Sequence, residues 1–413
     1  MSACVRWVQL LRLAASEARS LRSTRGTPGA LRVQGFGTSI FTEMTLLARE
    51  CGAINLAQGF PDFDGPLEVQ AAALEALRSG DNQYAVSHGQ LDLRTAVAEH
   101  ALRFYGQQVD GNSEVTVTSG ATEAIFAALQ ALIDPGDEVI VFEPFYDSYV
   151  PSVVMAGGVA RSVALRPPAW NFDPQELAQA FNTRTRAILI NTPHNPTGKV
   201  FSQAELECIA ALCREWNVLA LVDEVYEHLT YDGVAHVRLA QLAGMRERTL
   251  TISSAGKTFS YTGWKIGWVI APPALTAAVR SAHQFITFST ATPLQHAAAA
   301  GLRLPDSYFS TLAHEYLEKR NFLAGVLQRA GLGVLDCAGT YFLMADIAAR
   351  GFADDVEFCR FLTRNVGVAA VPPSAFFSDA NKALGKRYAR FSFCKKMATL
   401  QLAAERLEQP WKP

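Results

Sequence analysis

From about residue 114, short apolar runs rich in β-branched residues alternate with stretches of helical periodicity. This alternation is typical of a parallel sheet covered by helices, because each helix returns the chain to the edge where the next strand starts. Ser202 and Glu205 have the spacing of a capping box that opens a helix to Trp216. The pattern predicts an α/β fold with a large domain built on a mostly parallel sheet and a smaller α/β domain. The predicted strands of the large domain are residues 115–117, 138–142, 186–191, 218–222 and 249–253.

The pattern changes after about residue 305, where a long charged helix is followed by shorter strands and an amphipathic stretch. We expect this part to form the smaller domain, completed by an N-terminal segment that folds back onto it. The 413 residues are sufficient for both domains. The predicted parts are a leader (1–32), an N-terminal segment (33–60), a large domain (61–305) and a small domain (306–413) with strands at 341–345, 368–371 and 390–393 and a helix at 398–407.

The first 32 residues carry six arginines and a single acidic residue, Glu17. They resemble an organelle transit peptide, and a disordered extension is the alternative. Elsewhere no apolar run reaches the roughly 18 residues of a membrane span, and a formal net charge of −2 gives no broad field for nucleic acid or membrane. We therefore expect a soluble intracellular protein, cytoplasmic or, if the leader is a transit peptide, mitochondrial or plastid.

The seven cysteines are odd in number and form no Cys-x-x-Cys pair. This argues against a disulfide framework and against a zinc site, and it favours a reducing compartment. We expect no metal.

Lys257 lies in the segment 253–268, SSAGKTFSYTGWKIGW, among glycines, hydroxyls and aromatic rings, and Lys265 follows eight residues later. Partial burial lowers the pKa of a lysine and leaves an amine able to form a Schiff base, while a second cation can hold a phosphate. The combination suggests pyridoxal phosphate. A solvated surface lysine is the alternative. A nucleotide-binding P-loop fails on spacing, because Thr251 stands where that motif needs glycine.

The stretch 254–268 resembles the Schiff-base signature of class I aminotransferases of fold type I. Within that class the chain most resembles the kynurenine and glutamine transaminases, which include cysteine-S-conjugate β-lyases, and the bacterial and plant methionine aminotransferases. The resemblance implies a homodimer that works in amino-acid metabolism with pyridoxal 5'-phosphate, without nucleic acid or membrane partners. It runs from about residue 35 to the C-terminus and rests on motifs at 55–63 (NLAQGFPDF), 82–84 (NQY), 143–146 (EPFY), 195–198 (NPTG), 223–226 (DEVY) and 390–391 (RF).

The resemblance implies roles around the cofactor ring. Lys257 would form the Schiff base, and Asp223, which ends an apolar strand, would keep the pyridine nitrogen protonated. Tyr226 and Asn195 would bind the phenolic oxygen, and Phe145 would stack on the ring. The alternatives are a turn or capping acid for Asp223, local backbone hydrogen bonds for Tyr226 and Asn195, and ordinary core for Phe145.

The phosphate is expected where residues 119–122 join a strand to a helix, since free N–H groups and the positive helix end face the crevice there. A plain N-cap is the alternative. By resemblance, Tyr84 reaches the phosphate of the neighbouring subunit. The remaining phosphate contacts that the resemblance implies are Ala121, Thr122, Ser254 and Lys265.

Arg390 lies within an aromatic strand, where its guanidinium could grip a substrate α-carboxylate with two hydrogen bonds. A structural salt bridge is the alternative. By resemblance Arg390 is the carboxylate clamp, aided by Asn195 and by backbone at Gly59. The resemblance places side-chain preference in Phe60, Ile40, Ala121 and, from the neighbouring chain, Phe288.

The animal kynurenine enzymes have tryptophan where Ile40 aligns and tyrosine where Ala121 aligns. Isoleucine and alanine at these positions leave the substrate pocket with fewer aromatic side chains. This favours flexible apolar substrates such as methionine, with phenylalanine, leucine, glutamine and kynurenine also possible. One buried methylene is worth only about 0.8 kcal/mol, so specificity is expected to be broad.

We therefore predict a ping-pong aminotransferase in which Lys257 moves the substrate proton. Two alternatives stay open: β-elimination from cysteine S-conjugates at the same site, and a cofactor-binding regulator without catalysis. Such regulators carry a DNA-binding module, and the N-terminal extension shows no helix-turn-helix pattern. The complete set of Lys257, Asp223, Tyr226 and Arg390 favours an enzyme.

Overall fold

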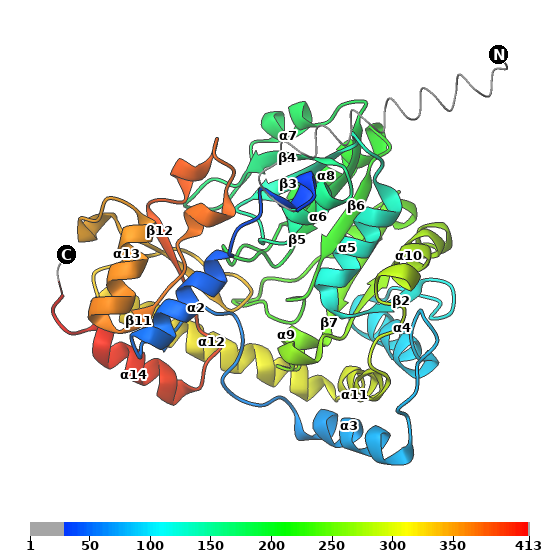
Figure 1. Ribbon diagram of the computed structural model, residues 1–413, viewed down its shortest axis with the longest axis horizontal. Coiled ribbons are helices and arrows are strands. Elements are labelled where there is room, and N and C mark those ends of the chain that lie inside the picture. The colour runs from blue at the N-terminus through cyan, green and yellow to red at the C-terminus, as the bar shows by residue number, and fades with distance from the viewer. Residues whose placement is uncertain (1–28, 412–413) are drawn as a thin grey trace. The chain divides into compact units, whose positions relative to one another are not determined.

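The computed structural model describes residues 29–411, and a seven-stranded sheet forms its centre (Figure 1). The strand order is β2-β8-β7-β6-β5-β3-β4, and only β8 runs antiparallel to its neighbours. The predicted mostly parallel sheet is confirmed. The strands are β2 (Val115–Thr118), β3 (Glu138–Glu143), β4 (Val159–Ala164), β5 (Thr185–Asn191), β6 (Leu219–Asp223), β7 (Thr249–Ser254) and β8 (Gly267–Ile270).

The sequence pattern missed two of these strands, β4 and β8. β4 is an edge strand that pairs only with β3, and its first residues are exposed or half-buried, so its sequence VARSVA lacks a continuous apolar run. β8 has only four residues and begins with glycine, which is unfavourable in strands.

Alternate residues of the central strands pack against helices on opposite faces of the sheet. Val139 and Val141 of β3 share a core with α5 (Gly120–Leu132), whereas Ile140 and Phe142 share another core with α8 (Gln203–Glu215). Strands buried on both faces read as continuous apolar runs, which is why they were visible in the sequence. The other helices of these layers are α6 (Tyr149–Met155), α7 (Pro174–Ala180) and α10 (Pro273–Ile286).

The predicted capping box at the start of α8 is confirmed. The Ser202 hydroxyl accepts a hydrogen bond from the Glu205 N–H at 3.3 Å, and the Ser202 N–H donates to the Glu205 carboxylate at 2.9 Å. A further apolar cluster joins the β2–β8 end of the sheet to α3 (Leu67–Ser79), α4 (Leu91–Tyr105), α9 (Ala255–Thr258) and α11 (Thr292–Leu302).

The C-terminal third forms smaller sheets. β10 (Phe342–Asp346) pairs antiparallel with β12 (Tyr388–Ser392) and with β9 (Gly333–Val334). β1 (Ile54–Asn55), from near the N-terminus, pairs parallel with β11 (Val368–Ala369). The helices of this part are α2 (Ile40–Glu50), α12 (Asp306–Arg329), α13 (Asp355–Phe361) and α14 (Met397–Leu407).

The N-terminal helix α2 lies beside elements from the other end of the sequence (Figure 1). Its Met44 and Leu47 share one core with Phe391 of β12 and Leu400 of α14. Two segments that are distant in sequence therefore form one apolar core, which fixes the start of α2 relative to Arg390.

The described residues from Thr38 onward form one compact unit, and residues 29–37 are not part of it. Within residues 29–37, Leu31–Val33 makes a single 3-10 turn. Most of the predicted leader lies outside the described residues, and the domain boundaries near 60 and 305 stay predictions. No helix between residues 29 and 411 is both long and apolar enough to cross a membrane.

A buried carboxylate connects the large sheet to the C-terminal part. Glu143, at the end of β3, accepts hydrogen bonds from the Ser378 N–H and the Asn381 side chain, each at 2.8 Å. Two residues later the Phe145 N–H donates to the Phe376 carbonyl at 2.8 Å. These bonds hold the 373–381 segment against the carboxyl edge of the sheet.

Candidate active site

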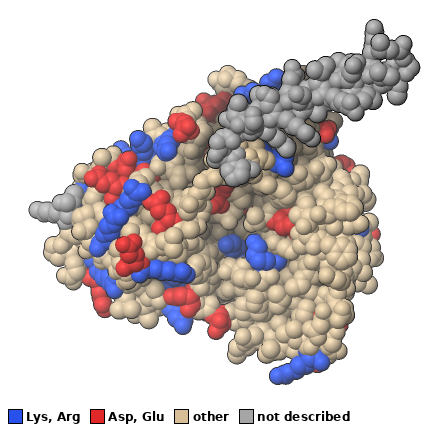
Figure 2. Space-filling view, viewed as in Figure 1, with Lys and Arg blue, Asp and Glu red and all other residues tan. Residues whose placement is uncertain are grey.

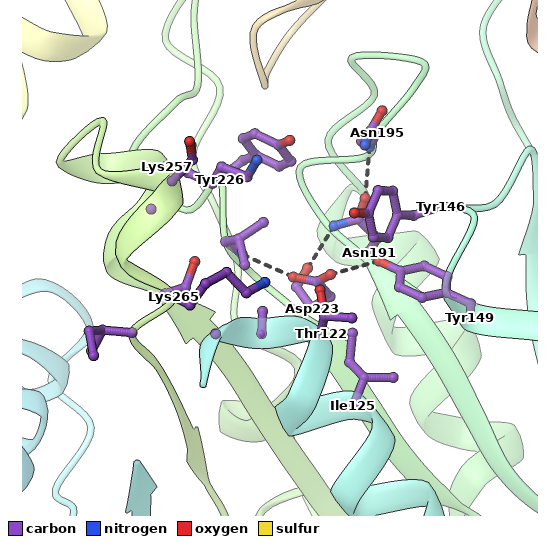
Figure 3. Close-up of a pocket in the computed structure, with 17 residues that line it drawn as sticks. Thr122, Ile125, Tyr146, Tyr149, Asn191, Asn195, Asp223, Tyr226, Lys257 and Lys265 are labelled. Carbon is purple, nitrogen blue, oxygen red and sulfur yellow. Dashed lines mark hydrogen bonds between the residues drawn. The ribbon is translucent and has the colours of Figure 1, made fainter. Parts of the chain in front are cut away.

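The carboxyl ends of β2, β5, β6 and β7 meet at one cavity of about 660 Å³, the solvent at its mouth included (Figure 3). Ligands in open parallel sheets gather at this edge. Figure 2 shows Lys and Arg side chains in a hollow near the middle of the same face. The predicted site residues that line the cavity are Ala121, Thr122, Asn195, Asp223, Tyr226, Ser254, Lys257 and Lys265.

Asp223 ends β6 and is buried at the cavity wall. The Tyr149 hydroxyl donates to its Oδ2 at 2.7 Å, and the Val225 N–H donates to its Oδ1 at 3.3 Å. Burial raises the pKa of Asp223 to about 6, while the Tyr149 hydrogen bond and the Lys257 charge oppose that rise. At neutral pH the carboxylate can therefore accept a proton or a hydrogen bond from a ligand.

Lys257 lies on α9, the single turn that follows β7. Its Nζ is 5.7 Å from the Tyr226 ring centroid and 5.6 Å from that of Tyr341. Burial lowers the pKa of Lys257 to about 8, the Asp223 charge opposes this, and the Lys265 charge adds to it. A substantial fraction of this amine is uncharged at mildly alkaline pH and is nucleophilic.

The first turn of α5 approaches Lys265 without any side chain between them. Lys265 has φ +56°, an unfavourable backbone conformation for lysine, and a Cβ placed on Gly120 would lie 3.1 Å from its Nζ. A Cβ on Gly267 would lie 2.7 Å from the Ala121 nitrogen. Ser119 makes no side-chain cap, and Gly120, Ala121 and Thr122 of the first turn of α5 line the cavity together with Lys265. This arrangement suits an anion such as phosphate.

Arg390 is fully buried on β12 and has no carboxylate partner among the described residues. Its Nη1 donates to Asn195 Oδ1 at 2.8 Å and its Nη2 donates to the Ala57 carbonyl at 2.7 Å, while its Nε has no partner. Burial lowers the pKa of Arg390 to about 10. The structural salt bridge that was the alternative for Arg390 is not formed, and the buried charge calls for an anionic ligand.

Aromatic rings enclose the Arg390 guanidinium. Its central carbon lies 4.0 Å from the Phe342 ring centroid, 4.9 Å from that of Phe41 and 5.5 Å from that of Phe376. Sequence reasoning missed all three rings, because they come from α2, β10 and the 373–381 segment and no local motif marks them. They meet only after the two ends of the chain share a core.

The predicted substrate residues Gly59 and Phe60 are held from the C-terminal part through their carbonyl oxygens. The Tyr341 hydroxyl donates to the Gly59 carbonyl at 2.6 Å, and Lys395 Nζ donates to the Phe60 carbonyl at 2.7 Å. Ile40 is the half-buried first residue of α2. Neither Gly59, Phe60 nor Ile40 lines the cavity, and their substrate roles stay predictions.

Four other predicted residues also lie outside the cavity lining: Arg390, described above, Phe145, Tyr84 and Phe288. Phe145 is half-buried against the α5 side of the sheet. Tyr84 and Phe288 are exposed, and their ring centroids are 5.3 Å apart with an edge-to-face angle of 83°. A single chain therefore does not bring Tyr84 or Phe288 to its own cavity.

Asn191 and Tyr149 are among the polar lining residues that sequence reasoning missed; Tyr146 and Thr262 are others. The Asn191 side chain donates to the Asp223 carbonyl at 2.9 Å and accepts from the Asn195 N–H at 2.7 Å. Asn191 is paired with Asp223 across β5 and β6, and each is the polar last residue of an apolar strand. The signal that pointed to Asp223 therefore also applied to Asn191. No sequence signal marks Tyr149.

The cavity residues fit pyridoxal phosphate. Lys257 and Lys265 are positive and Asp223 is the one carboxylate among the lining residues, so the cavity has an excess of positive charge suited to a phosphate dianion. Buried Arg390, joined to the lining residue Asn195, adds a cation suited to a carboxylate. Asp223 is placed to accept a ring N–H, and Lys257 offers the amine.

Comparison with known proteins agrees with this chemistry. Residues 52–407 match the family described as aminotransferase class I and II. The chain is 44% identical over 373 residues to the methionine aminotransferase of Escherichia coli K12, covering 90% of this chain and 96% of that one. It is 40% identical over 415 residues to human kynurenine–oxoglutarate transaminase 1, covering 93% and 98%. The crystal structure of Escherichia coli YbdL, a methionine aminotransferase, superposes with a TM-score of 0.89 at 43% identity, covering 94% and 100%.

We predict that Lys257 reacts with small aldehydes at an unusually low pH. Only the uncharged amine reacts, so reductive methylation of the cofactor-free protein should show a midpoint near pH 8 at Lys257. Mass spectrometry of the digested protein from pH 6 to 10 measures this midpoint. Exposed Lys382 is the internal reference and should be modified much less at pH 8. Equal labelling of the two lysines at every pH would contradict the expected shift.

Proposed function

Since this chain belongs to the class I and II aminotransferases, we propose that it moves the α-amino group of an apolar, sulfur-containing or aromatic L-amino acid to a 2-oxo acid. The observation that carries the proposal is the occurrence in one site of a nucleophilic lysine, Lys257, and the buried Arg390. Within residues 29–411 Arg390 has no carboxylate partner, so it can take the carboxylate that every amino-acid substrate carries. Methionine is the donor that we favour, as in the Escherichia coli relative.

The cofactor is pyridoxal 5'-phosphate, which when bound supplies an electron-accepting ring that labilises the Cα–H bond and carries the amino group between substrates. Ser254, Lys265 and the N–H groups of Ala121 and Thr122 would hold its phosphate. Tyr226 and Asn195 would bind the phenolic oxygen, with Phe145 stacked on the ring. These assignments are supported by the lining of one cavity by all of these residues except Phe145.

Two of the chain's own groups handle protons. Lys257 Nζ is a base with a pKa of about 8 that can take the α-proton of the substrate and return it. Asp223 stays largely ionised at neutral pH, since the Tyr149 hydroxyl and the Val225 N–H both donate to it, and it accepts the ring N–H. Burial therefore lowers the pKa of Lys257 so that part of the amine is uncharged, whereas the hydrogen bonds to Asp223 keep its carboxylate charged despite burial.

The substrate carboxylate would lie against the Arg390 guanidinium, with Asn195 fixed by the same guanidinium at 2.8 Å. Phe41 and Phe376 pack against each other with centroids 5.4 Å apart and bound the apolar side of this region. At positions 40 and 121 the chain has isoleucine and alanine rather than large rings. We infer a pocket suited to the flexible methionine side chain, with aromatic donors also accepted.

We further propose a homodimer. Figure 2 shows few charged side chains over α3, α4, α10 and α11, and these elements and the loops beside them expose Leu67, Tyr84, Val86, Leu91, Phe285 and Phe288. Large exposed apolar patches mark protein interfaces. In such a dimer Tyr84 would approach the phosphate, and Phe288 the substrate, of the other subunit.

The proposed function is tested with a panel of L-amino acids against several 2-oxo acids. We expect methionine and phenylalanine to give the highest kcat/KM, kynurenine, leucine and glutamine lower values, and aspartate and lysine negligible turnover. Lys257→Ala should lose both turnover and the visible absorbance of the bound cofactor, whereas the matched exposed variant Lys382→Ala should keep both. Retained turnover in Lys257→Ala, or inert methionine and aromatic donors, would refute the proposal.

Tyr149→Phe should shift the acid limb of the pH–rate profile. The hydroxyl favours the charged form of Asp223, so its removal raises the pKa of Asp223 further above its usual value. A hydrogen bond to a charged group is worth about 1.5–3 kcal/mol, or about one to two pH units. We expect the acid limb of kcat/KM to move upward by at least about one unit. Tyr388→Phe, which removes the hydroxyl of another buried tyrosine, is the control, and an unmoved limb would show that Tyr149 does not act on Asp223.

Phe285→Glu should weaken the dimer. Phe285 is 86% exposed on α10, and a charge buried at the interface would cost enough to raise the dimer dissociation constant by at least about tenfold. Sedimentation equilibrium measures the constant. Leu402→Glu, at an exposed position of α14, is the matched control and should dimerise like the parent chain. A parent chain that sediments as a single subunit would refute the homodimer.

A further inference from the structure

His283 is a fully buried histidine near the end of α10 whose two ring nitrogens both face acceptors. Its Nδ1 lies 2.7 Å from Glu123 Oε1, and its Nε2 lies 2.7 Å from the Ser87 carbonyl oxygen. A neutral imidazole has one N–H and could serve only one of these acceptors. Glu123 also accepts a hydrogen bond from the Ser119 N–H at 2.5 Å through its other oxygen, so each of its oxygens faces a nitrogen. The ring therefore carries both protons and a positive charge.

The other groups around His283 agree with this charge state. The titratable or charged neighbours are Glu123 on α5, His88 in the segment before α4, and Arg280 one turn earlier on α10. Burial and nearby cations lower the pKa of His88 to about 4, so His88 is neutral. Burial also acts to lower the pKa of His283, but the Glu123 hydrogen bond and charge outweigh it, so the pKa of His283 lies above its usual value.

The Glu123 side of this pair supports residues 119–122, the loop proposed to hold the phosphate, which is called the phosphate loop below. Glu123 lies in the first turn of α5, and its Oε2 fixes the Ser119 N–H from behind the loop. The Ser119 hydroxyl lies 3.0 Å from the Thr290 hydroxyl, which ties the same loop to the residues after α10. Neither His283 nor Glu123 lines the cavity, so neither touches a ligand there.

On its other side His283 contacts Ser87, which belongs to residues 83–87, called the Tyr84 segment below. That segment is tied to the residues after α10 by the Thr292 hydroxyl, which donates to the Gln83 carbonyl at 2.6 Å, and by the Ser289 hydroxyl, which donates to the Ala85 carbonyl at 3.1 Å. The His283 carbonyl itself accepts from the Phe288 N–H at 3.1 Å. One residue thus contacts the support of the phosphate loop, the Tyr84 segment and the Phe288 turn.

We propose that His283 is a positioning residue whose imidazolium, paired with Glu123, holds the phosphate loop and the Tyr84 segment in one geometry and so sets the affinity for the cofactor phosphate. The inference rests on the proposed function, because it assumes that the loop holds a phosphate. Without the imidazolium, Glu123 is a carboxylate with a side chain only 9% exposed and no counterion, and it would pull the loop toward other donors or toward water.

The test uses the full-length chain freed of cofactor and titrated with pyridoxamine 5'-phosphate, which carries the phosphate but cannot form a Schiff base with Lys257. His283→Gln should raise the dissociation constant about 10- to 100-fold, the equivalent of one charge-assisted hydrogen bond. The double variant Glu123→Gln with His283→Gln should recover most of the affinity, because a glutamine oxygen still accepts the Ser119 N–H and no charge is left buried. His314→Gln, an exposed histidine on α12, should bind like the parent chain.

The pH dependence separates positioning from simple packing. Because the pKa of His283 is raised, its contribution is complete below the usual histidine pKa of about 6.5 and is lost as the pH rises through the raised value. Parent affinity should therefore fall as the pH rises through that value, and both glutamine variants should lack this component. Nitrogen-15 spectra of histidine-labelled parent chain should show both His283 nitrogens protonated at about pH 6.

The outcomes are distinguishable. A parent chain that binds the ligand while His283→Gln matches its affinity and pH profile overturns the inference and leaves the proposed function intact. A singly protonated His283 ring at about pH 6 also overturns it, and this spectrum needs no variant if His283→Gln fails to fold. A parent chain that binds neither pyridoxal phosphate nor its amine overturns the proposed function and, with it, the role inferred for His283.

Discussion

The site depends on keeping the positive charge of Arg390 buried without an acidic partner among the described residues. Arg390 is desolvated among aromatic rings and donates two hydrogen bonds to neutral oxygens, while half-buried Lys257 and exposed Lys265 share a cavity with the single carboxylate of Asp223. Such charge is costly in an empty site and favourable once an anion enters. The stability needed to hold it comes from the sheet and from the cores on both of its faces.

The parallel strands determine where this charge collects. Asn191, Asp223 and Ser254 end three adjacent strands, so the polar residue that follows each apolar run arrives at the same edge. That much could be predicted from the sequence, because a strand buried on both faces is a continuous apolar run and its polar end is visible. Ser202 and Glu205 were equally predictable, since a capping box is local.

What could not be predicted depends on contacts between distant segments. Phe41 and Phe376 meet at Arg390 only because α2 shares a core with the C-terminal helices and because Glu143 holds the 373–381 segment. Tyr149 reaches Asp223 across 74 positions of sequence. The conformation of Lys265 also escaped prediction, since a lysine with positive φ is tolerated only where the surroundings fix it. Local spacing contains no information on such contacts, whereas the family motifs pointed to residues that line the cavity but not to the residues that support them.

The charged side chains behind the strand ends differ in one respect from those that line the cavity. They are saturated, which means that other groups of the protein already form their hydrogen bonds. On the far side of β6 and β7, Glu227 accepts from the Arg238 guanidinium at 2.7 Å and from the Ser253 hydroxyl at 2.8 Å, so both of its oxygens are used. His100 and His228 lie close enough to Glu227 to suggest metal ligands, but their facing nitrogens are 2.7 Å apart and bond to each other. Glu123 is likewise shared between Ser119 and His283.

Saturated pairs behind the strand ends resist movement, because breaking one leaves a buried charge without a partner. The cations in front of them remain free to exchange one anionic ligand for another, as a reaction with two successive substrates requires.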